Sequence, residues 1–226
     1  MQIGGVQKTS LLDFPDKISA IVFTQGCNFR CGYCHNPELI NSKEQVWTLP
    51  ALFDFLNARK GKLDGVVITG GEPCLQNDLE DVIKEIKALG FLVKLDTNGY
   101  FPQKLKKLLP HLDYIAMDIK APLEKYSKIT CVKVDTEKIK ESITTIMFSG
   151  IDYEFRTTVV KSQLSFEDFE HLGQLIKGAK RYYLQKFIPS KLLDETFMNE
   201  TTYTNEEFQQ IIEILHQYVP NATLRN

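Results

Sequence analysis

Short apolar runs of strand length alternate along the chain with stretches in which apolar residues recur about every 3.6 positions. Runs of the first kind predict buried strands, and stretches of the second kind predict amphipathic helices. The predicted strands cover residues 18–24, 65–69, 91–97, 114–119, 153–160 and 181–187. The predicted helices begin near residues 49, 79, 105, 139, 166 and 204. Strands separated in this way by helices favour βαβ units and therefore a parallel sheet.

Six such units are fewer than the eight that close a TIM barrel. We therefore predict an α/β fold, a partial (β/α)6 barrel of the TIM type. Its core would cover about residues 18–188, followed by a C-terminal helix over about residues 204–219. Because no repeat, low-complexity segment or linker interrupts the pattern, residues 1–226 are predicted to form a single domain.

Charge and composition narrow the function classes. The formal net charge is −2 and the pI is about 6.1, so no nucleic-acid or anionic-membrane surface is expected. No apolar run approaches the roughly 20 residues of a membrane helix, and the first residues lack the pattern of a secretion signal. We therefore predict a cytoplasmic protein, whose reducing compartment suits thiolate ligands. Two isolated cysteines, Cys74 and Cys131, are expected to be small buried core residues.

The remaining three cysteines lie close together as Cys27, Cys31 and Cys34, in a C-x3-C-x2-C spacing. A structural zinc site needs four protein ligands, and electron-transfer iron–sulfur clusters also take four thiolates. Three thiolates on one loop would hold a [4Fe–4S] cube by three irons and leave the fourth iron open to a substrate or cofactor. The alternative is three loop thiols, two of them joined in a disulfide.

Polar residues also interrupt strands that should be apolar on both faces in a buried parallel sheet. Each pair shares one face of a strand: Lys94 with Asp96, Asp118 with Lys120, and Glu154 with Arg156. If these faces point into the barrel, its interior is a charged site. The alternative, strongest for Lys94 and Glu154, is that the charges pair with each other or face solvent. Asp96 and Asp118 lie at strand carboxyl ends, where barrel enzymes keep their chemistry.

Other small and polar residues are predicted at the same ends. The cysteine loop follows the first predicted strand. The second predicted strand is followed by Gly70, Gly71 and Glu72, and residues 97–99 lie at the end of the third. Glycines at such a turn let the backbone approach a ligand closely. The sequence therefore predicts a site at the carboxyl ends of the strands.

The segments that carry these residues resemble a known family. They are residues 21–37, 69–73, 96–99, 116–120 and 154–160. Together they resemble the radical S-adenosylmethionine (SAM) enzymes, and among these the activases of glycyl radical enzymes. Residues 3–15 are similar to the anaerobic ribonucleoside-triphosphate reductase activating proteins.

The resemblance implies one [4Fe–4S] cluster per chain and SAM as cofactor. The reduced cluster would donate an electron, since iron–sulfur potentials extend to roughly −700 mV, and SAM would be cleaved to methionine and a 5′-deoxyadenosyl radical. That radical would take hydrogen from a glycine of a glycyl radical enzyme, with anaerobic ribonucleotide reductase as the expected partner. An electron donor of the flavodoxin or ferredoxin type is also implied.

The resemblance assigns roles residue by residue. Cys27, Cys31 and Cys34 would bind the cluster, and Lys120 would join them in catalysis. SAM would be bound by the following residues: Tyr33, His35, Gly70, Gly71, Glu72, Asp96, Asp118, Ile119, Lys120 and Arg156. Tyr33 would meet the adenine, and Gly70 to Glu72 the methionyl amino group. Arg156 would contact the SAM carboxylate or ribose, or else form a salt bridge with Glu154 or Asp118. In some activases the residues matching Asp96 and Asp118 help to bind a monovalent cation, which is a further expectation here.

Three features depart from the family pattern. Cys74 stands where this group often has threonine, which would place a thiol near SAM. Activases of the formate-lyase type carry a histidine after the last strand, whereas residues 185–188 contain none. No cysteine lies between His35 and Thr48, so no auxiliary ferredoxin-like cluster is expected there.

Two other functions stay open at this point. The first is a radical SAM enzyme that acts on a small molecule, similar to the 7-carboxy-7-deazaguanine synthases. The second is a non-catalytic iron–sulfur or zinc module that binds a partner. The absent fourth ligand and the charged strand faces favour an enzyme, and the lateral opening of a six-unit barrel favours a protein substrate.

Overall fold

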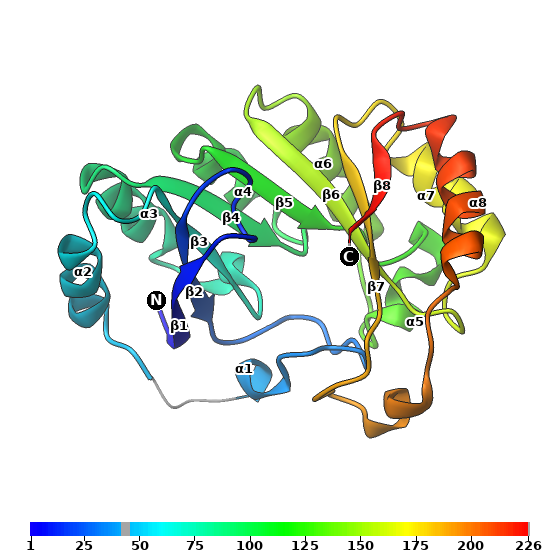
Figure 1. Ribbon diagram of the computed structural model, residues 1–226, viewed down its shortest axis with the longest axis horizontal. Helices are drawn as coiled ribbons and strands as arrows, with labels where there is room; N and C mark the ends of the chain where they lie inside the picture. The colour runs from blue at the N-terminus through cyan, green and yellow to red at the C-terminus, as the bar shows by residue number, and fades with distance from the viewer. Residues whose placement is uncertain (42–45, 226) are drawn as a thin grey trace. The chain divides into compact units, whose positions relative to one another are not determined.

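The computed structural model describes residues 1–41 and 46–225 (Figure 1), so part of the segment between His35 and Thr48 lies outside the described residues. The strands are β1 (Ile3–Ser10), β2 (Ser19–Thr24), β3 (Gly65–Gly70), β4 (Leu92–Thr97), β5 (Tyr114–Asp118), β6 (Asp152–Val159), β7 (Tyr182–Lys186) and β8 (Ala222–Arg225). The α-helices are α1 (Pro37–Asn41), α2 (Leu49–Ala58), α3 (Leu79–Ala88), α4 (Pro102–Leu108), α5 (Tyr126–Ile129), α6 (Thr136–Met147), α7 (Phe166–Leu175) and α8 (Asn205–His216). Short 3-10 helices are η1 (Pro73–Leu75), η2 (Leu109–His111), η3 (Leu123–Lys125) and η4 (Glu195–Asn199).

The strands follow one another through one sheet in the order β1 to β8. β1 pairs antiparallel with β2, whereas the β2–β3, β3–β4, β6–β7 and β7–β8 pairs are parallel. The six predicted strands correspond to β2–β7, and a helix or helical turn follows each of them. The predicted α/β class with its parallel sheet is therefore confirmed.

Contacts group the described residues into two compact units. The first unit comprises Met1–Asn28, Glu38–Thr97 and Gln103–Ala116, and the second comprises Phe29–Pro37, Asn98–Pro102 and Met117–Asn226. Each unit is described below by itself. That residues 1–226 form a single domain stays a prediction.

The first unit has an apolar core beneath its strands. Buried Phe14 and Tyr114 pack with Ile21 of β2 and Val67 of β3, and the two aromatic rings are 6.1 Å apart. α3 lies beside β4 (Figure 1), and its apolar stripe of Leu79, Val82, Ile83 and Ile86 is buried. The 3.6-residue period of these side chains explains why this segment forms a helix with one covered face.

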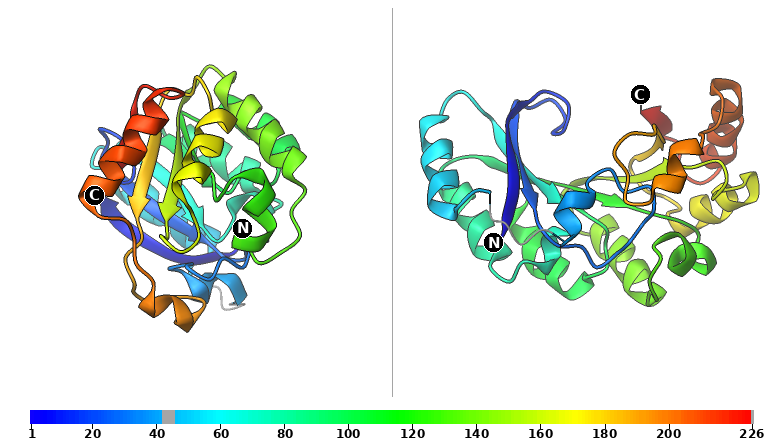
Figure 2. Two further views of the ribbon diagram at one scale, coloured as in Figure 1. Left: turned by 90° about the vertical axis from the view of Figure 1, so that its right-hand side faces the viewer. Right: turned by 90° about the horizontal axis from the view of Figure 1, so that it is seen from below.

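In the second unit, α7 and α8 pack side by side next to β8 (Figure 2). Both helices begin with a capping box, formed by Ser165 with Asp168 in α7 and by Thr204 with Glu207 in α8. A capping box satisfies two backbone N–H groups that the first helical turn leaves without partners. These caps fix where the two helices start.

The structure adds two strands and corrects one residue. β1 and β8, at opposite ends of the strand order, had no predicted counterpart. The expectation that Cys131 is a buried core residue is wrong, because its side chain is exposed and its backbone has a φ of +55°. Cys74 is buried, as expected.

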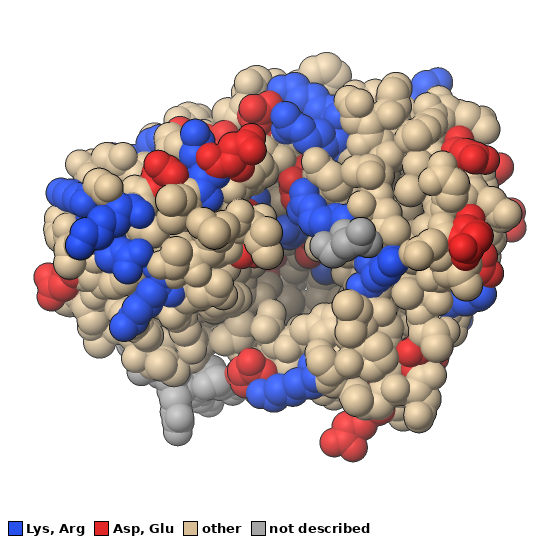
Figure 3. Space-filling model, viewed as in Figure 1, with Lys and Arg blue, Asp and Glu red and all other residues tan. Residues whose placement is uncertain are grey.

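None of the helices in the described part of the chain is long and apolar enough to cross a membrane. On the face drawn in Figure 3, basic and acidic side chains are interspersed among uncharged residues. That face therefore presents no extended surface of one sign.

Candidate functional site

The cysteine loop runs from the end of the first unit into the second. Cys27 and Cys34 are half-buried, Cys31 is buried, and none of the three is in a disulfide. The structure therefore contradicts the alternative in which two of these thiols form a disulfide. Three reduced thiols on one loop can supply ligands to three irons of a [4Fe–4S] cube.

Burial and the nearby charge of Lys120 act in opposite directions on the Cys31 thiol in the second unit. Burial raises the pKa of its thiol from 9.0 to about 11, against the charge of Lys120, which lowers it. The thiol is therefore protonated at neutral pH. Lys120 is therefore close enough to Cys31 to influence its charge.

Tyr33 is buried in the same unit, and its hydroxyl oxygen makes no hydrogen bond to any described residue. Burial, followed by the charge of Cys31, raises the pKa of Tyr33 well above its usual value. A buried hydroxyl without a partner is costly, and such groups often mark a place where a ligand or water binds. Tyr33 is the residue that the resemblance places beside the adenine.

The charged group at the end of β5 is the electrostatic centre of the second unit. Asp118 accepts a hydrogen bond from Lys120 Nζ at 2.9 Å through Oδ2 and from Arg156 Nε at 2.9 Å through Oδ1. Burial disfavours the Asp118 charge, but Arg156 and Lys120 outweigh it and hold the pKa of that carboxyl well below its usual range. Of the alternatives for Arg156, the structure has the salt bridge to Asp118.

Backbone contacts fix this strand end. The Ile119 N–H donates to the Arg156 carbonyl at 2.8 Å, and the Thr157 hydroxyl donates to the Ile119 carbonyl at 2.6 Å. The Ile119 side chain is fully buried. Ile119, predicted to touch SAM, therefore presents backbone groups that β6 already engages.

Tyr126 of α5 joins the strand end to the cysteine loop. Its hydroxyl accepts from the Lys120 N–H at 3.2 Å, and its ring lies edge-on to Phe29 at 6.3 Å. One turn later, the Thr130 carbonyl accepts from the Arg30 N–H at 2.8 Å. The sequence analysis missed Tyr126, since a tyrosine in a short helical stretch carries no signal of its own.

In the first unit, the turn after β3 is shaped by its two glycines. Gly70 has a φ of +120°, and a Cβ there would lie 2.3 Å from the Thr24 nitrogen. A Cβ on Gly71 would lie 2.0 Å from the Gly26 carbonyl oxygen. No other residue fits either position, so these glycines bring the turn against the backbone that leads to Cys27.

Glu72 follows those glycines and is fully buried. Its Oε1 accepts from the Cys74 N–H at 2.9 Å and from the Thr97 hydroxyl at 2.8 Å. The Cys74 sulfur lies 3.7 Å from the same hydroxyl oxygen. Burial, with the charge of Glu72, raises the pKa of Cys74 well above its usual value. The sequence analysis placed Thr97 at the end of its strand but did not predict its contact with Glu72.

The other strand charges form ion pairs. Lys94 Nζ lies 2.6 Å from Asp96 Oδ1, and both side chains are almost covered. Glu154 is buried and accepts two hydrogen bonds from Arg225 of β8, at 2.7 and 2.8 Å. Lys94 thus pairs with Asp96, as the alternative expected, whereas Glu154 pairs with Arg225, a partner that the alternative did not include.

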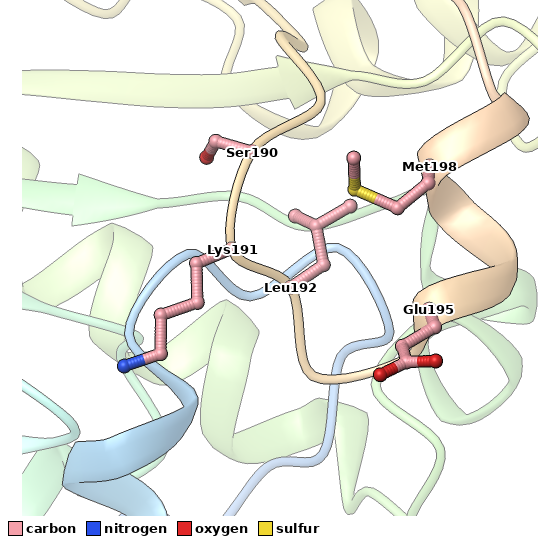
Figure 4. A pocket seen from close by; sticks show the side chains of 5 residues that line it. All are labelled: Ser190, Lys191, Leu192, Glu195 and Met198. Atoms are coloured by element: carbon pink, nitrogen blue, oxygen red, sulfur yellow. The ribbon is translucent and has the colours of Figure 1, made fainter.

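His35 contacts the segment of the second unit that follows β7, and a pocket lies in the same segment. His35 is exposed, its Nε2 donates to the Ile188 carbonyl at 2.9 Å, and its ring lies 5.8 Å from that of Phe187. A pocket of about 450 Å³ is lined by Ser190, Lys191, Leu192, Glu195 and Met198. In Figure 4 the Leu192 and Met198 side chains point toward each other, while Lys191 extends away from them.

Among the described residues, one group of three potential ion ligands lies within 4.8 Å of one another, namely Glu124, Asp168 and His171. It includes none of the cysteines. Asp168 already accepts hydrogen bonds from Lys125 and from Ser165, whose helix it caps. His171 and Glu124 pair at 2.9 Å. These contacts account for the group without an ion.

Each unit therefore contains some of the predicted site residues. The second unit brings together Cys31, Tyr33, Asp118, Lys120 and Arg156, and the first holds the glycine turn and Glu72. The residues fit a cluster and a polar cofactor on three grounds: reduced cysteine thiols, a buried hydroxyl without a partner, and a half-buried charged group.

Comparison with known proteins supports the same family. The family model described as the radical SAM superfamily matches residues 21–176. The "Putative glycyl-radical enzyme activating enzyme MJ1227" of Methanocaldococcus jannaschii is 33% identical over 233 residues, covering 99% of this chain and 95% of that protein. The pyruvate formate-lyase-activating enzyme of Clostridium pasteurianum is 36% identical over 125 residues, covering 53% of this chain and 52% of that enzyme.

A solved structure shows the same fold. Streptococcus suis SuiB bound to S-adenosylmethionine matches with a TM-score of 0.69 at 14% identity, over 91% of this chain and 50% of that one. The radical SAM family implies a [4Fe–4S] cluster and SAM, the two groups that the residues above fit. The chain thus belongs to the radical SAM superfamily and, within it, to the family of the glycyl-radical enzyme activating enzymes.

Proposed function

We propose that this protein generates a glycyl radical on a partner enzyme, and that the partner is an anaerobic ribonucleoside-triphosphate reductase. The observation that carries the activase function is similarity to a glycyl-radical enzyme activating enzyme along 99% of the chain. The choice of partner is supported by residues 3–15, which resemble the activating proteins of that reductase. A cytoplasmic location and a flavodoxin- or ferredoxin-type electron donor belong to the same proposal.

Cys27, Cys31 and Cys34 are proposed to hold the cluster. When bound, the reduced cluster and SAM supply a 5′-deoxyadenosyl radical that takes a hydrogen atom from the substrate. The chain's own contribution is to bind and orient these groups, because the difficult chemistry belongs to the cofactor. Cys31, whose burial raises the pKa of its thiol to about 11, gives up its proton when iron binds.

The charged residues of the second unit are proposed to bind the polar part of SAM. Lys120 and Arg156 are both held by Asp118, so neither needs to be reoriented when a carboxylate or ribose arrives. Preformed geometry of this kind lowers the entropy cost of binding. Tyr33 supplies a buried hydroxyl and a ring for the adenine. His35 and Ile119 complete this side of the site.

The residues of the first unit are proposed to bind the methionyl end. The turn of Gly70 and Gly71 exposes backbone groups that no side chain obstructs, and Glu72 is locked beneath it. Asp96 is proposed to help bind a monovalent cation. Its pairing with Lys94 supplies a fixed carboxylate for this role.

The first experiment is anaerobic reconstitution with iron and sulfide. We expect about four irons per chain, because three thiolates and one open iron make up a single cube. Replacing Cys27, Cys31 or Cys34 with alanine should abolish the cluster. Cys131→Ala is the matched control, since this thiol is exposed and lies outside the loop. A cluster that survives loss of any one of the three would contradict the assignment.

The second experiment asks what the substrate is. Reduced protein and SAM should release 5′-deoxyadenosine and methionine slowly when alone. Addition of an anaerobic ribonucleoside-triphosphate reductase should produce the doublet electron paramagnetic resonance signal of a glycyl radical on that reductase. SAM cleavage coupled to a small molecule, with no signal on any reductase, would favour the small-molecule alternative instead.

A further inference from the structure

The segment after β7 lies directly against the cysteine loop in the second unit (Figures 1 and 2). The Leu193 N–H donates to the Cys34 carbonyl at 3.1 Å, and the Asp194 N–H donates to the Gly32 carbonyl at 3.1 Å. These two bonds engage neighbouring sites on the loop that carries the cysteines. The loop backbone therefore has protein partners before any cofactor is considered.

Phe197 supplies the side-chain part of this contact. Its ring lies 6.4 Å from that of Tyr33 and 6.5 Å from that of Phe187. Gly32 has no Cβ at the point of contact, and one placed there would lie 2.4 Å from Phe197 Cε2. The absence of a side chain at Gly32 is thus what lets the ring close over the loop.

The segment has its own internal order. Asp194 caps η4, because its Oδ1 accepts from the Thr196 N–H at 2.9 Å and from the Thr196 hydroxyl at 2.7 Å. The Asp194 carbonyl also accepts from the Phe197 N–H at 3.1 Å. The turn that holds Phe197 is therefore tied to the same residue whose N–H binds Gly32.

We propose that residues 193–197, called here the clamp, are a positioning element that sets the backbone of residues 32–34 and the ring of Tyr33. This rests on the proposed function in one respect, namely that Cys31 and Cys34 bind the cluster. Phe197 is a positioning residue, because it contacts Gly32 and Tyr33 and acts on the thiols only through the loop. A loop held in this way loses less conformational freedom when it binds a cluster, so it binds more tightly.

The test is a double-mutant cycle on Gly32→Ala and Phe197→Ala, first by amide hydrogen exchange in the cluster-free protein. In Gly32→Ala the added Cβ displaces the ring, so the amides of Leu193 and Asp194 should exchange about tenfold faster. Phe197→Ala alone should raise these rates by about threefold, since packing is lost but both hydrogen bonds can form. The double variant should match Phe197→Ala alone, because the ring that the added Cβ would strike is gone.

The second readout is loss of iron to a chelator after reconstitution. It should be several-fold faster in Gly32→Ala, and in the double variant it should return to the smaller increase seen in Phe197→Ala. The electron paramagnetic resonance spectrum of the reduced cluster should change in Gly32→Ala, and the double variant should give the spectrum of Phe197→Ala. Met198→Ala, on the same short helix but exposed, is the matched control and should change none of these quantities.

Unchanged exchange at Leu193 and Asp194 in Gly32→Ala would overturn the clamp, as would strictly additive effects in the cycle. Faster exchange with unchanged iron loss would also overturn it, because the clamp would then not position the cysteine loop. A wild-type chain that takes up no iron overturns the proposed function. The exchange cycle uses cluster-free protein, so it decides on the clamp separately.

Discussion

The glycine turn of the first unit and the charged end of β5 in the second unit are held in opposite ways. Around Gly70 and Gly71 the backbone itself leaves no space, and Glu72 below them is fully buried. At the end of β5, Asp118 and Lys120 are partly exposed, and their geometry depends on ion pairs. One region is fixed by steric exclusion and the other by charge.

This difference teaches how each region responds to change. A tight steric fit leaves no free space between atoms, so one added methyl group forces the backbone to move. A partly exposed ion pair is weaker, because solvent screens it and its side chains retain some freedom. A partly exposed pair also keeps its charged groups accessible to a ligand without breaking the pair.

Of the substitutions considered, Gly71→Ala should cause the largest loss of stability. The new Cβ would lie 2.0 Å from the Gly26 carbonyl oxygen, so the turn or the segment before Cys27 must shift. We expect a loss of about 3 kcal/mol in the free energy of unfolding, measured by denaturant titration. Gly5→Ala is the control, since its Cβ would meet Phe23 at an ordinary 3.9 Å. Equal stability of the two variants would contradict the steric account.

Thr97→Val should cause the second-largest loss of stability. It removes the hydroxyl that donates to the buried Glu72 carboxylate at 2.8 Å while keeping the side-chain volume. The expected loss of stability is about 2 kcal/mol, because a buried charge loses a hydrogen bond. Thr97→Ser keeps the hydroxyl and should lose less. If valine and serine behave alike, the hydroxyl does not support Glu72.

Arg156→Gln should have a smaller effect, about 1 kcal/mol at pH 7, because Lys120 still pairs with Asp118. The sign of its pH dependence follows from the lowered pKa of Asp118. A carboxyl with a lowered pKa stabilises the fold above its unfolded pKa of about 4, and this stabilisation is lost as pH falls. The difference in stability between wild type and variant should therefore narrow below about pH 4. A difference that widens there would contradict the ion-pair account.

Cys131→Ala should have the smallest effect. Its thiol is exposed and lies outside the loop of the three cysteines, so iron content should not change. Cys74→Ala is the informative comparison, because Cys74 is buried and contacts Thr97. It should lower stability by about 1 kcal/mol and leave the iron content at the wild-type value. Loss of iron in either variant would show that a further thiol takes part.

The six central strands could be predicted because each contains a short apolar run that is largely buried, even where polar residues interrupt it, as in β4 and β6. β1 could not, since Ile3–Ser10 is an edge strand with two glycines and three exposed residues in its second half. β8 is only four residues long, which is too short for a periodic pattern. Cys131 was wrongly placed because residue type alone does not reveal a turn with positive φ.

The candidate site likewise has features that could be predicted from the sequence and contacts that could not. The cysteine spacing and the glycine turn are local in sequence, so they could be recognised directly. Partners that come from distant elements could not: Thr97 beneath Glu72, Arg225 on Glu154, and Phe197 against Gly32. These contacts depend on the fold, and no periodicity in the chain encodes which distant side chain fills each position.

The most direct test of the central claim follows the hydrogen atom. The reductase is prepared with glycine deuterated at Cα and incubated anaerobically with reduced protein and SAM. Our account predicts deuterium in the 5′-deoxyadenosine, together with collapse of the glycyl radical doublet, because the reacting groups must meet closely for transfer. Deuterium that instead reaches 5′-deoxyadenosine from a labelled purine precursor or other metabolite would contradict the account.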